Sequence, residues 1–307
     1  MVVNHPKPAI GKNDIEKVQF IFPDEIFFVH GEQDLLVVLL NGKVFKRQSI
    51  TDNDQKNTEG PKYVELFDLK DVVKHAETID KKLYIATATT LYRINKGAED
   101  KEKIVLQAIH KDDFLKICAL SVSEDGEMLV YGDYEGKVTV KTPTTQYECI
   151  EHEDAIVGIV ILKRVIFTAS EDGMLLKTKI GETEPKDAYE VGKPIRYFGK
   201  LDNKLVLLDA YGTPYTLSKT TNDLRKEKKL VRKVTFVNKV SDGLYASHDN
   251  DHFKITTYKT VNRIQVPPKR TDGLFEYKNR LYFYAGEEIT GWEVKKATEL
   301  EEFFEDL

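Results

Sequence analysis

One pattern recurs along the chain and restricts its fold more than any other feature. An apolar run leads into a turn rich in Gly, Asp or Asn, and a second run follows in which apolar and polar residues alternate. The stretch KRVIFTASEDGMLLKTKI (163–180) is an example. Such runs around such a turn predict a β-hairpin. The pattern occupies residues 35–48, 83–95, 128–142, 165–179, 205–219, 244–259 and 281–294.

The spacing of these hairpins indicates a larger unit. A short apolar run precedes each hairpin, and a more polar run follows every hairpin but the last, so one unit contains four strands. The turns lie roughly 37 to 47 residues apart, which is the period of a propeller blade. We therefore predict an all-β fold, a seven-bladed β-propeller of four-stranded antiparallel blades. In each blade strand A lines the axis, strands B and C follow, and strand D forms the outer edge.

The two ends of the chain complete this layout. The last repeat lacks its own fourth strand, and IEKVQFIF (15–22) belongs to no other repeat. We expect residues 15–22 to pair with the strand that bears Trp292, which would close the ring and remove two open sheet edges. The predicted organisation is an N-terminal extension (1–14), a propeller (15–294) and an acidic amphipathic tail (295–307).

The arrangement resembles WD-repeat β-propellers over about residues 14–294. The best-matched repeat runs from His152, near the position of that family's Gly-His pair, to Ser170 and Asp172 in the turn. Trp292-Glu293 stands where the family's Trp-Asp pair ends strand C. In the other repeats other residues replace that pair, so no blade carries the family's complete His–Ser/Thr–Asp–Trp network. The resemblance implies a non-catalytic interaction scaffold, usually a subunit of a larger complex.

Composition fits a soluble globular protein, with 41% hydrophobic and 32% charged residues and a net charge of −5. No apolar run is long enough to cross a bilayer, and the N-terminus has no apolar signal core. Cys118 and Cys149 lie in apolar runs without a CxxC pattern, which favours buried thiols over a disulfide or a metal site. Together these features predict a cytoplasmic or nuclear protein.

The sequence contains none of the common phosphate-binding, metalloprotease or serine-hydrolase motifs, so we predict no catalytic residues, no cofactor and no enzyme activity. One turn, SHDNDHF (247–253), carries metal-ligating residue types: His248, Asp249, Asp251 and His252. We interpret it as a solvated hairpin turn, with metal binding as the alternative, because closed metal sites usually draw ligands from several segments. His152 is interpreted as a hydrogen-bonding residue of its blade.

In a propeller the D–A and B–C loops share one face, and here those loops are rich in acids. An acidic face would attract basic peptides or domains, although surface charge also serves solubility. The predicted partner contacts are the acids of this face and two tail phenylalanines that lie on one apolar stripe. They are Asp112, Asp113, Asp133, Glu153, Asp154, Glu171, Asp172, Asp209, Asp249, Phe303 and Phe304. The tail is expected either to dock into a partner or to pack on its own propeller.

A basic run, LRKEKKLVRK (224–233), stands apart from these acids. Its cations are Arg225, Lys226, Lys228, Lys229, Arg232 and Lys233. We expect it to form an outer edge strand whose lysines prevent edge-to-edge pairing, with phosphate contact as the alternative. The predicted function is a protein–protein interaction scaffold, a monomeric propeller within an intracellular hetero-complex, that binds a basic partner. The alternative is a non-catalytic subunit of an RNA-associated complex, in RNA modification or ribosome assembly.

Overall fold

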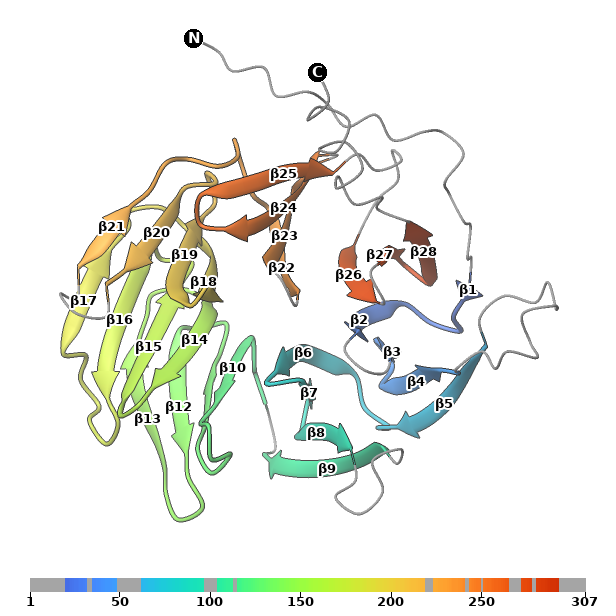
Figure 1. The fold of residues 1–307 in the computed structure, drawn as a ribbon. Coiled ribbons are helices and arrows are strands. Elements are labelled where there is room, and N and C mark those ends of the chain that lie inside the picture. The colour runs from blue at the N-terminus through green and yellow to red at the C-terminus, as the bar shows by residue number, and fades with distance from the viewer. Residues whose placement is uncertain are drawn as a thin grey trace, which may run out of the picture.

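The computed structural model describes residues 20–31, 35–48, 62–96, 104–112, 115–218, 223–240, 243–249, 251–264, 272–277 and 280–292. These residues form four-stranded antiparallel sheets arranged around a common axis (Figure 1). Every regular element within the described ranges is a strand, so none of them is a helix that could span a membrane. The predicted all-β architecture of four-stranded blades is confirmed.

Six sheets are continuous blades, each made of four consecutive strands with strand A on the inside. Blade 1 contains β2 (Ile26–Gly31), β3 (Leu35–Leu39), β4 (Lys43–Arg47) and β5 (Tyr63–Asp68). Blade 2 contains β6 (Val73–Ile79), β7 (Lys82–Thr87), β8 (Thr90–Lys96) and β9 (Ile104–Lys111). Blade 3 contains β10 (Ala119–Val122), β11 (Leu129–Gly132), β12 (Lys137–Lys141) and β13 (Gln146–Glu151).

Blade 4 contains β14 (Ile156–Leu162), β15 (Val165–Ser170), β16 (Met174–Lys179) and β17 (Asp187–Glu190). Blade 5 contains β18 (Ile195–Leu201), β19 (Lys204–Asp209), β20 (Pro214–Leu217) and β21 (Leu224–Lys226). Blade 6 contains β22 (Phe236–Val240), β23 (Gly243–His248), β24 (Asp251–Thr257) and β25 (Thr260–Ile264).

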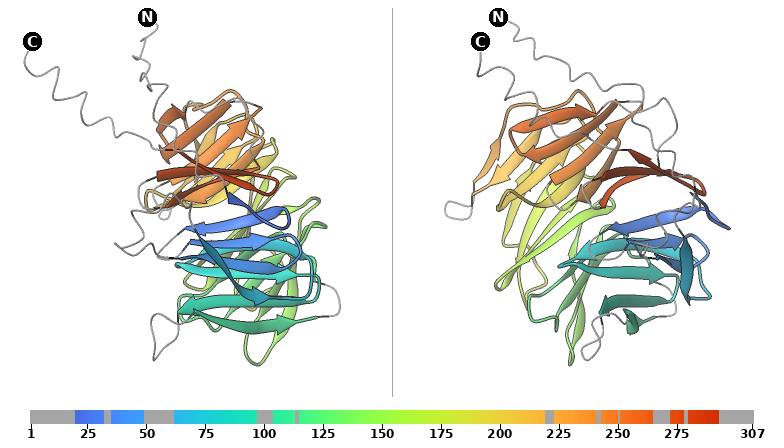
Figure 2. Two further views of the ribbon diagram at one scale, coloured as in Figure 1. Left: turned by 90° about the vertical axis from the view of Figure 1, so that its right-hand side faces the viewer. Right: turned by 45° about the vertical axis from the view of Figure 1, so that its right-hand side comes forward.

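The remaining sheet, here called the closing sheet, combines both ends of the chain. It contains β26 (Gly273–Tyr277), β27 (Arg280–Ala285), β28 (Glu288–Trp292) and, as its outer strand, β1 (Phe20–Ile21). Strand β1 pairs with β28 through Phe20↔Ile289 and Ile21↔Glu288. In Figure 2 this sheet, in red, lies beside the blue β2 in both views, and the inner strands β2 and β26 are in contact.

The fold-class prediction of seven blades is therefore corrected: six blades are continuous, and the sheet that completes the ring is composite. Its outer strand ends at Ile21, one residue before the predicted end at Phe22. Residues 15–19 lie outside the described residues, and pairing ends at Ile21. Phe22 turns into the core, where it is 1% exposed, and Pro23 follows with no backbone N–H for a ladder. The predicted partner strand, which ends at Trp292, is the one observed.

The core lies between neighbouring blades. Val130 and Val140 of blade 3, for example, form one buried cluster with Ile156 and Ile166 of blade 4. The ring is closed by the same kind of contact. Phe22 and Ile26 share a cluster with Phe275, Tyr282 and other residues of the closing sheet. Each blade thus buries its faces against its neighbours, and fully burying one large apolar side chain contributes about 1.5–3 kcal/mol.

Candidate partner-binding face

The loops that join D to A and B to C meet at one end of the ring, here called the upper face. This follows from antiparallel pairing, because strand A starts at the end of the sheet where strand B finishes. In blades 1 to 5 the B–C turn is bonded to the D–A connection that leaves its blade. The carbonyl of Gly136 accepts a hydrogen bond from His152 N (3.0 Å), that of Gly173 from Val191 N (2.9 Å), and that of Gly212 from Leu230 N (2.9 Å). The upper face is therefore a framework of mutually bonded loops.

Glycine is required in these turns for two reasons. Gly136 has φ +88° and Gly212 has φ +72°, a region that side chains disfavour. A Cβ on Gly136 would lie 2.2 Å from the carbonyl oxygen of His152, and one on Gly212 would lie 2.3 Å from that of Val231. The turn glycines seen in the sequence thus let two loops approach more closely than any other residue would permit.

A carboxylate holds the same turn in blades 3 and 5. Asp133 Oδ1 accepts hydrogen bonds from the backbone N–H groups of Glu135 (2.9 Å) and Lys137 (2.8 Å). Asp209 Oδ1 accepts the equivalent bonds from Tyr211 (2.9 Å) and Thr213 (2.8 Å). Asp209 is only 2% exposed. The prediction that Asp209 is a partner contact is therefore wrong, because its carboxylate is buried and occupied by its own turn.

In blade 4 a histidine network performs this task. His152 donates or accepts at both ring nitrogens, with Nδ1 3.0 Å from Asp172 Oδ2 and Nε2 2.9 Å from Thr168 Oγ1. Asp172 Oδ1 also accepts the Met174 N–H at 2.7 Å. Burial lowers the pKa of His152, while Asp172 opposes that shift. The role predicted for His152 agrees with these contacts, and Asp172 belongs to the same network.

Blade 3 contains a related pair that the sequence analysis did not identify. Tyr131 lies five residues before its turn glycine, as Thr168 does, and its hydroxyl is 3.3 Å from Nε2 of the buried His110. Lys141 Nζ lies 2.6 Å from Nδ1 of the same imidazole. Burial and then Lys141 lower the pKa of His110. The signal available in the sequence was that His110, like His152, lies close to the end of the polar run that follows its hairpin.

Exposed acids of the upper face concentrate on blades 3 and 4. Asp112, Glu153 and Asp154 are exposed; Glu135 is exposed and paired with Lys116. Glu171 is half-buried and forms an ion pair with Arg196 Nη1 at 2.5 Å. We call Asp112, Glu135, Glu153, Asp154 and Glu171 the acidic sector. Of the other predicted contacts, Asp249 is exposed on blade 6, and Asp113, Phe303 and Phe304 lie outside the described residues.

The basic run lies elsewhere than predicted. Only Arg225 and Lys226 belong to the edge strand β21, while residues 227–235 form the D–A connection on the upper face. Within it Val231 and Val234 are buried in a cluster with apolar residues of blades 5 and 6. Because these two valines are anchored in the core, the edge strand ends early and the charged residues between the valines stay exposed to solvent.

We call Lys193, Lys228, Lys229, Arg232 and Lys233 the basic sector. Apart from Lys193, which precedes blade 5, these residues occupy the connection from blade 5 to blade 6, and all five are exposed. None of the five forms an ion pair with another described residue. Lys193 Nζ instead lies 5.3 Å from the ring centre of Tyr211. The upper face is therefore not uniformly acidic, and the two sectors lie on neighbouring parts of the ring.

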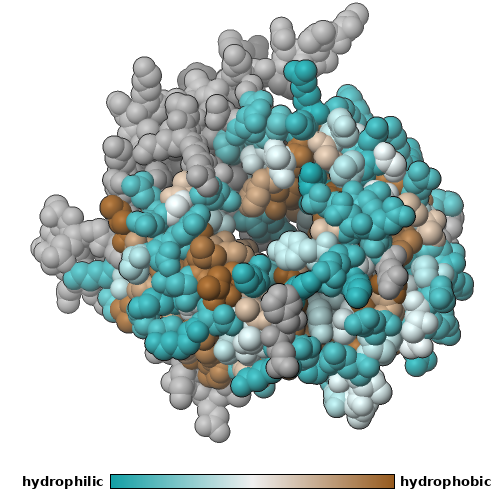
Figure 3. Space-filling view, turned by 180° about the vertical axis from the view of Figure 1, so that it is seen from behind, coloured by the Kyte–Doolittle hydropathy of each residue, from teal (hydrophilic) through white to brown (hydrophobic). Residues whose placement is uncertain are grey.

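Two tyrosines project from the turns of this face. Tyr134 in blade 3 is 58% exposed and Tyr211 in blade 5 is 49% exposed. Exposed tyrosines on fixed turns supply contact area at a low cost in side-chain entropy. Figure 3 shows one face of the ring as a largely hydrophilic surface with a hollow at its centre.

The turn with metal-ligating residues does not bring them together. His248 Nδ1 is 2.8 Å from Thr235 Oγ1 and its Nε2 is 3.3 Å from Asp249. His252 is 3% exposed and packs edge-on against Phe283 of the closing sheet, with ring centres 6.2 Å apart. Within the described ranges no three His, Cys, Asp or Glu residues are placed to share a metal ion.

Neither thiol is activated. Burial raises the pKa of Cys118 to about 12 and that of Cys149 to about 11, which keeps both protonated near neutrality. Both are free, as the sequence predicted, although Cys118 is only partly buried.

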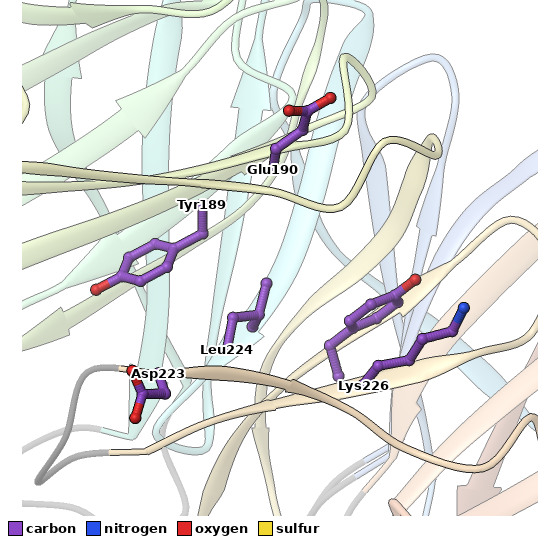
Figure 4. Close-up of a pocket in the computed structure, with 6 residues that line it drawn as sticks. Tyr189, Glu190, Asp223, Leu224 and Lys226 are labelled. Carbon is purple, nitrogen blue, oxygen red and sulfur yellow. The ribbon is translucent and has the colours of Figure 1, made fainter.

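A shallow pocket of about 280 Å³ lies between the outer edges of blades 4 and 5 (Figure 4). Tyr189 and Glu190 come from β17, Tyr215 comes from β20, and Asp223, Leu224 and Lys226 line the β21 side. Tyr215 is buried and its hydroxyl is 3.4 Å from Asp209 Oδ2. The lining mixes aromatic rings with charges of both signs, so it defines no ligand chemistry.

Comparison with known proteins places the fold but not the family. No family model matches the sequence, and the search of curated proteins found no match. Among solved structures, the WD40 β-propeller domain of Doa1 is 11% identical, with a TM-score of 0.59, covering 90% of this chain and 94% of that one. A chain of the mitotic checkpoint complex is 12% identical, with a TM-score of 0.60 and coverage of 96% and 97%.

The computationally designed Ika8 protein gives similar values, with 12% identity, a TM-score of 0.59 and coverage of 92% and 98%. At such identities the likeness concerns the fold alone. The chain is a β-propeller whose structural neighbours include WD40 domains, and its sequence supplies no family evidence for WD-repeat membership.

Proposed function

We propose that the protein is a non-catalytic interaction scaffold that binds another protein through its upper face. The observation that carries the proposal is the pair of exposed tyrosines, Tyr134 and Tyr211, held on turns that are bonded to neighbouring loops and flanked by exposed charges. Interfaces place most of their binding energy in a few aromatic and charged residues. A rigid framework also lowers the entropy lost on binding.

The proposal keeps the wider setting that the sequence predicted. The protein acts as a monomeric propeller within a hetero-complex in the cytoplasm or nucleus. The acidic sector receives a basic segment of the partner. Structural neighbours that include a WD40 domain and a chain of a checkpoint complex support a scaffold role by analogy of fold.

Affinity capture with the full chain, followed by mass spectrometry, tests this function. We expect the wild type to capture a partner that the variant Tyr134→Ala/Tyr211→Ala does not capture. The affinity of this variant for the partner should be at least about tenfold weaker than that of the wild type. Tyr258→Ala is the matched control, because Tyr258 lies in a C–D turn on the opposite face, over Lys204 and Lys259. Equal capture by all three proteins would contradict the use of the upper face.

A second candidate is a non-catalytic RNA-associated subunit, favoured by one observation. Lys228, Lys229, Arg232 and Lys233 are exposed on a loop face instead of protecting a strand edge. Cations arranged in this way can neutralise phosphates, and such binding weakens steeply with salt. A salt-titrated assay with single-stranded RNA tests the candidate, and absence of binding at low salt would exclude it.

A further inference from the structure

The two charged sectors of the upper face suggest what kind of partner it receives. The acidic sector is supplied by the loops of blades 3 and 4, and the basic sector by the loops into blade 5 and between blades 5 and 6. Because these blades are consecutive in the ring, the sectors adjoin. The ion pair between Glu171 and Arg196 joins blade 4 to blade 5 at their boundary.

Most charges in both sectors are available to a partner. In the acidic sector Glu153 and Asp154 are exposed and form no ion pair with another described residue, and the same holds for Lys228 and Lys229 in the basic sector. The Glu153 N–H donates to Asp172 and the Asp154 carboxylate accepts from the Ala155 N–H, so their backbone is fixed. Val231 and Val234 anchor the basic loop in the same way.

Exposed charges of opposite sign on adjoining sectors select a partner by its charge pattern. A purely basic partner would be repelled by blades 5 and 6, and a purely acidic partner by blades 3 and 4. We propose that the upper face binds a protein segment of bipolar charge, whose basic part lies on the acidic sector and whose acidic part lies on the basic sector. This rests on the proposed scaffold function and specifies its partner.

A synthetic peptide with a lysine block, a Gly/Ser spacer and a glutamate block provides the probe. The control peptide has the same composition with lysine and glutamate interleaved. With fluorescence anisotropy at low salt, we expect the block peptide to bind about tenfold or more tightly than the interleaved one. Equal affinities would overturn the proposal, since a face that reads only net charge cannot distinguish the two peptides.

Charge reversal gives a sharper test. Glu153→Lys/Asp154→Lys should remove the preference for the block peptide, and so should Lys228→Glu/Lys229→Glu. The combined variant carries all four substitutions and should also lack the preference, because the three acids and three cations that remain in the two sectors offset the new charges. All four side chains are exposed, so melting temperatures should stay near that of the wild type. Full preference for the block peptide in either single-sector variant contradicts the proposal.

Two further arms separate this proposal from its alternatives. If single-stranded RNA displaces the block peptide from the wild type and binds more tightly, the basic sector is a phosphate site and the bipolar partner is overturned. If the block peptide shows no preference but affinity capture still depends on Tyr134 and Tyr211, the scaffold function stands and only the bipolar partner fails.

Discussion

Blades 3 and 4 build the upper face differently from blade 5, although the same turn connects strands B and C. In blades 3 and 4 a buried histidine from the end of the preceding blade meets a hydroxyl five residues before the turn glycine, as His110 meets Tyr131 and His152 meets Thr168. Blade 5 has Leu207 at that position, 0% exposed, so Asp209 holds its turn without a histidine, whereas blade 3 has both His110 and the turn carboxylate of Asp133. The first arrangement supports the acidic sector and the second the basic sector. The turn is therefore the conserved unit of construction, and its stabilising groups and surface charges vary independently.

The largest losses of stability are expected when the turn glycines, which occur in both sectors, are replaced. Gly136→Ala and Gly212→Ala should each lower the free energy of unfolding by about 3 kcal/mol, because a side chain at positive φ is strained and its Cβ would meet a carbonyl oxygen. Chemical denaturation measures the loss.

Gly126→Ala is the matched control for these variants. Gly126 also has positive φ, +77°, but a Cβ there meets nothing within 4 Å. It should cost about 1 kcal/mol. Equal losses for all three variants would show that the close approach of the loops contributes nothing.

The next largest loss of stability is expected when the carboxylate that holds the turn is removed. Asp209→Ala should cost about 2 kcal/mol, since it leaves the buried N–H group of Thr213 and the part-buried N–H group of Tyr211 without this acceptor. Asp133→Ala should cost about 1 kcal/mol, because Asp133 is half-buried and water can replace it. A loss for Asp133→Ala as large as that for Asp209→Ala would contradict the burial argument.

The histidine network should make stability depend on pH. The pKa of His152 is lowered in the folded protein, so below about 6.5 the unfolded chain binds more protons. Stability contributed by neutral His152 is therefore present above pH 6.5 and lost as pH falls from there towards the folded pKa. His152→Gln should reduce the slope of unfolding free energy against pH between about pH 7 and 5. The pKa values of His110 and His252 are lowered by burial too, so part of the slope should remain. An unchanged slope would exclude His152 as a contributor.

The smallest effect is expected at the boundary between the sectors. A double-mutant cycle with Glu171→Gln and Arg196→Met should give a coupling of about 0.5 kcal/mol, because both side chains are about one-third exposed and solvent screens them. Repeating the cycle at high salt should remove most of the coupling. A coupling of several kcal/mol would mean that the ion pair holds blades 4 and 5 together.

Much of the fold could be read from the residues because repetition amplifies a weak signal. One apolar run with a Gly- or Asp-rich turn predicts little, but the same pattern at a constant period predicts a blade. The strand that ends at Trp292 was predicted to pair with the N-terminal segment, and Phe20 and Ile21 do pair there. The extent of that pairing was not predictable, because it depends on Phe22 entering a core shared with Tyr63 and Phe275.

The candidate site was less predictable than the fold. Glu153 and Asp154 lie on loops, as the repeat pattern predicted, whereas Asp209 was predicted to be exposed and Lys228 to lie in an edge strand. Both errors have the same origin. The sequence around an acid in a turn does not show whether its carboxylate faces water or binds its own backbone. The end of the edge strand depends on where Val231 and Val234 pack in the core.

The sequence by itself determined the repeating four-stranded unit, its turn chemistry and the pairing of the last repeat with the start of the chain, because these depend on local periodicity and on residues that only certain turns accept. Tertiary structure alone decided which charges face a partner. Val231 and Val234 fold a basic segment over the loop end of the ring, and Asp209 turns inward, since burial of apolar groups and satisfaction of buried N–H groups outweigh the weak preference of any single surface charge.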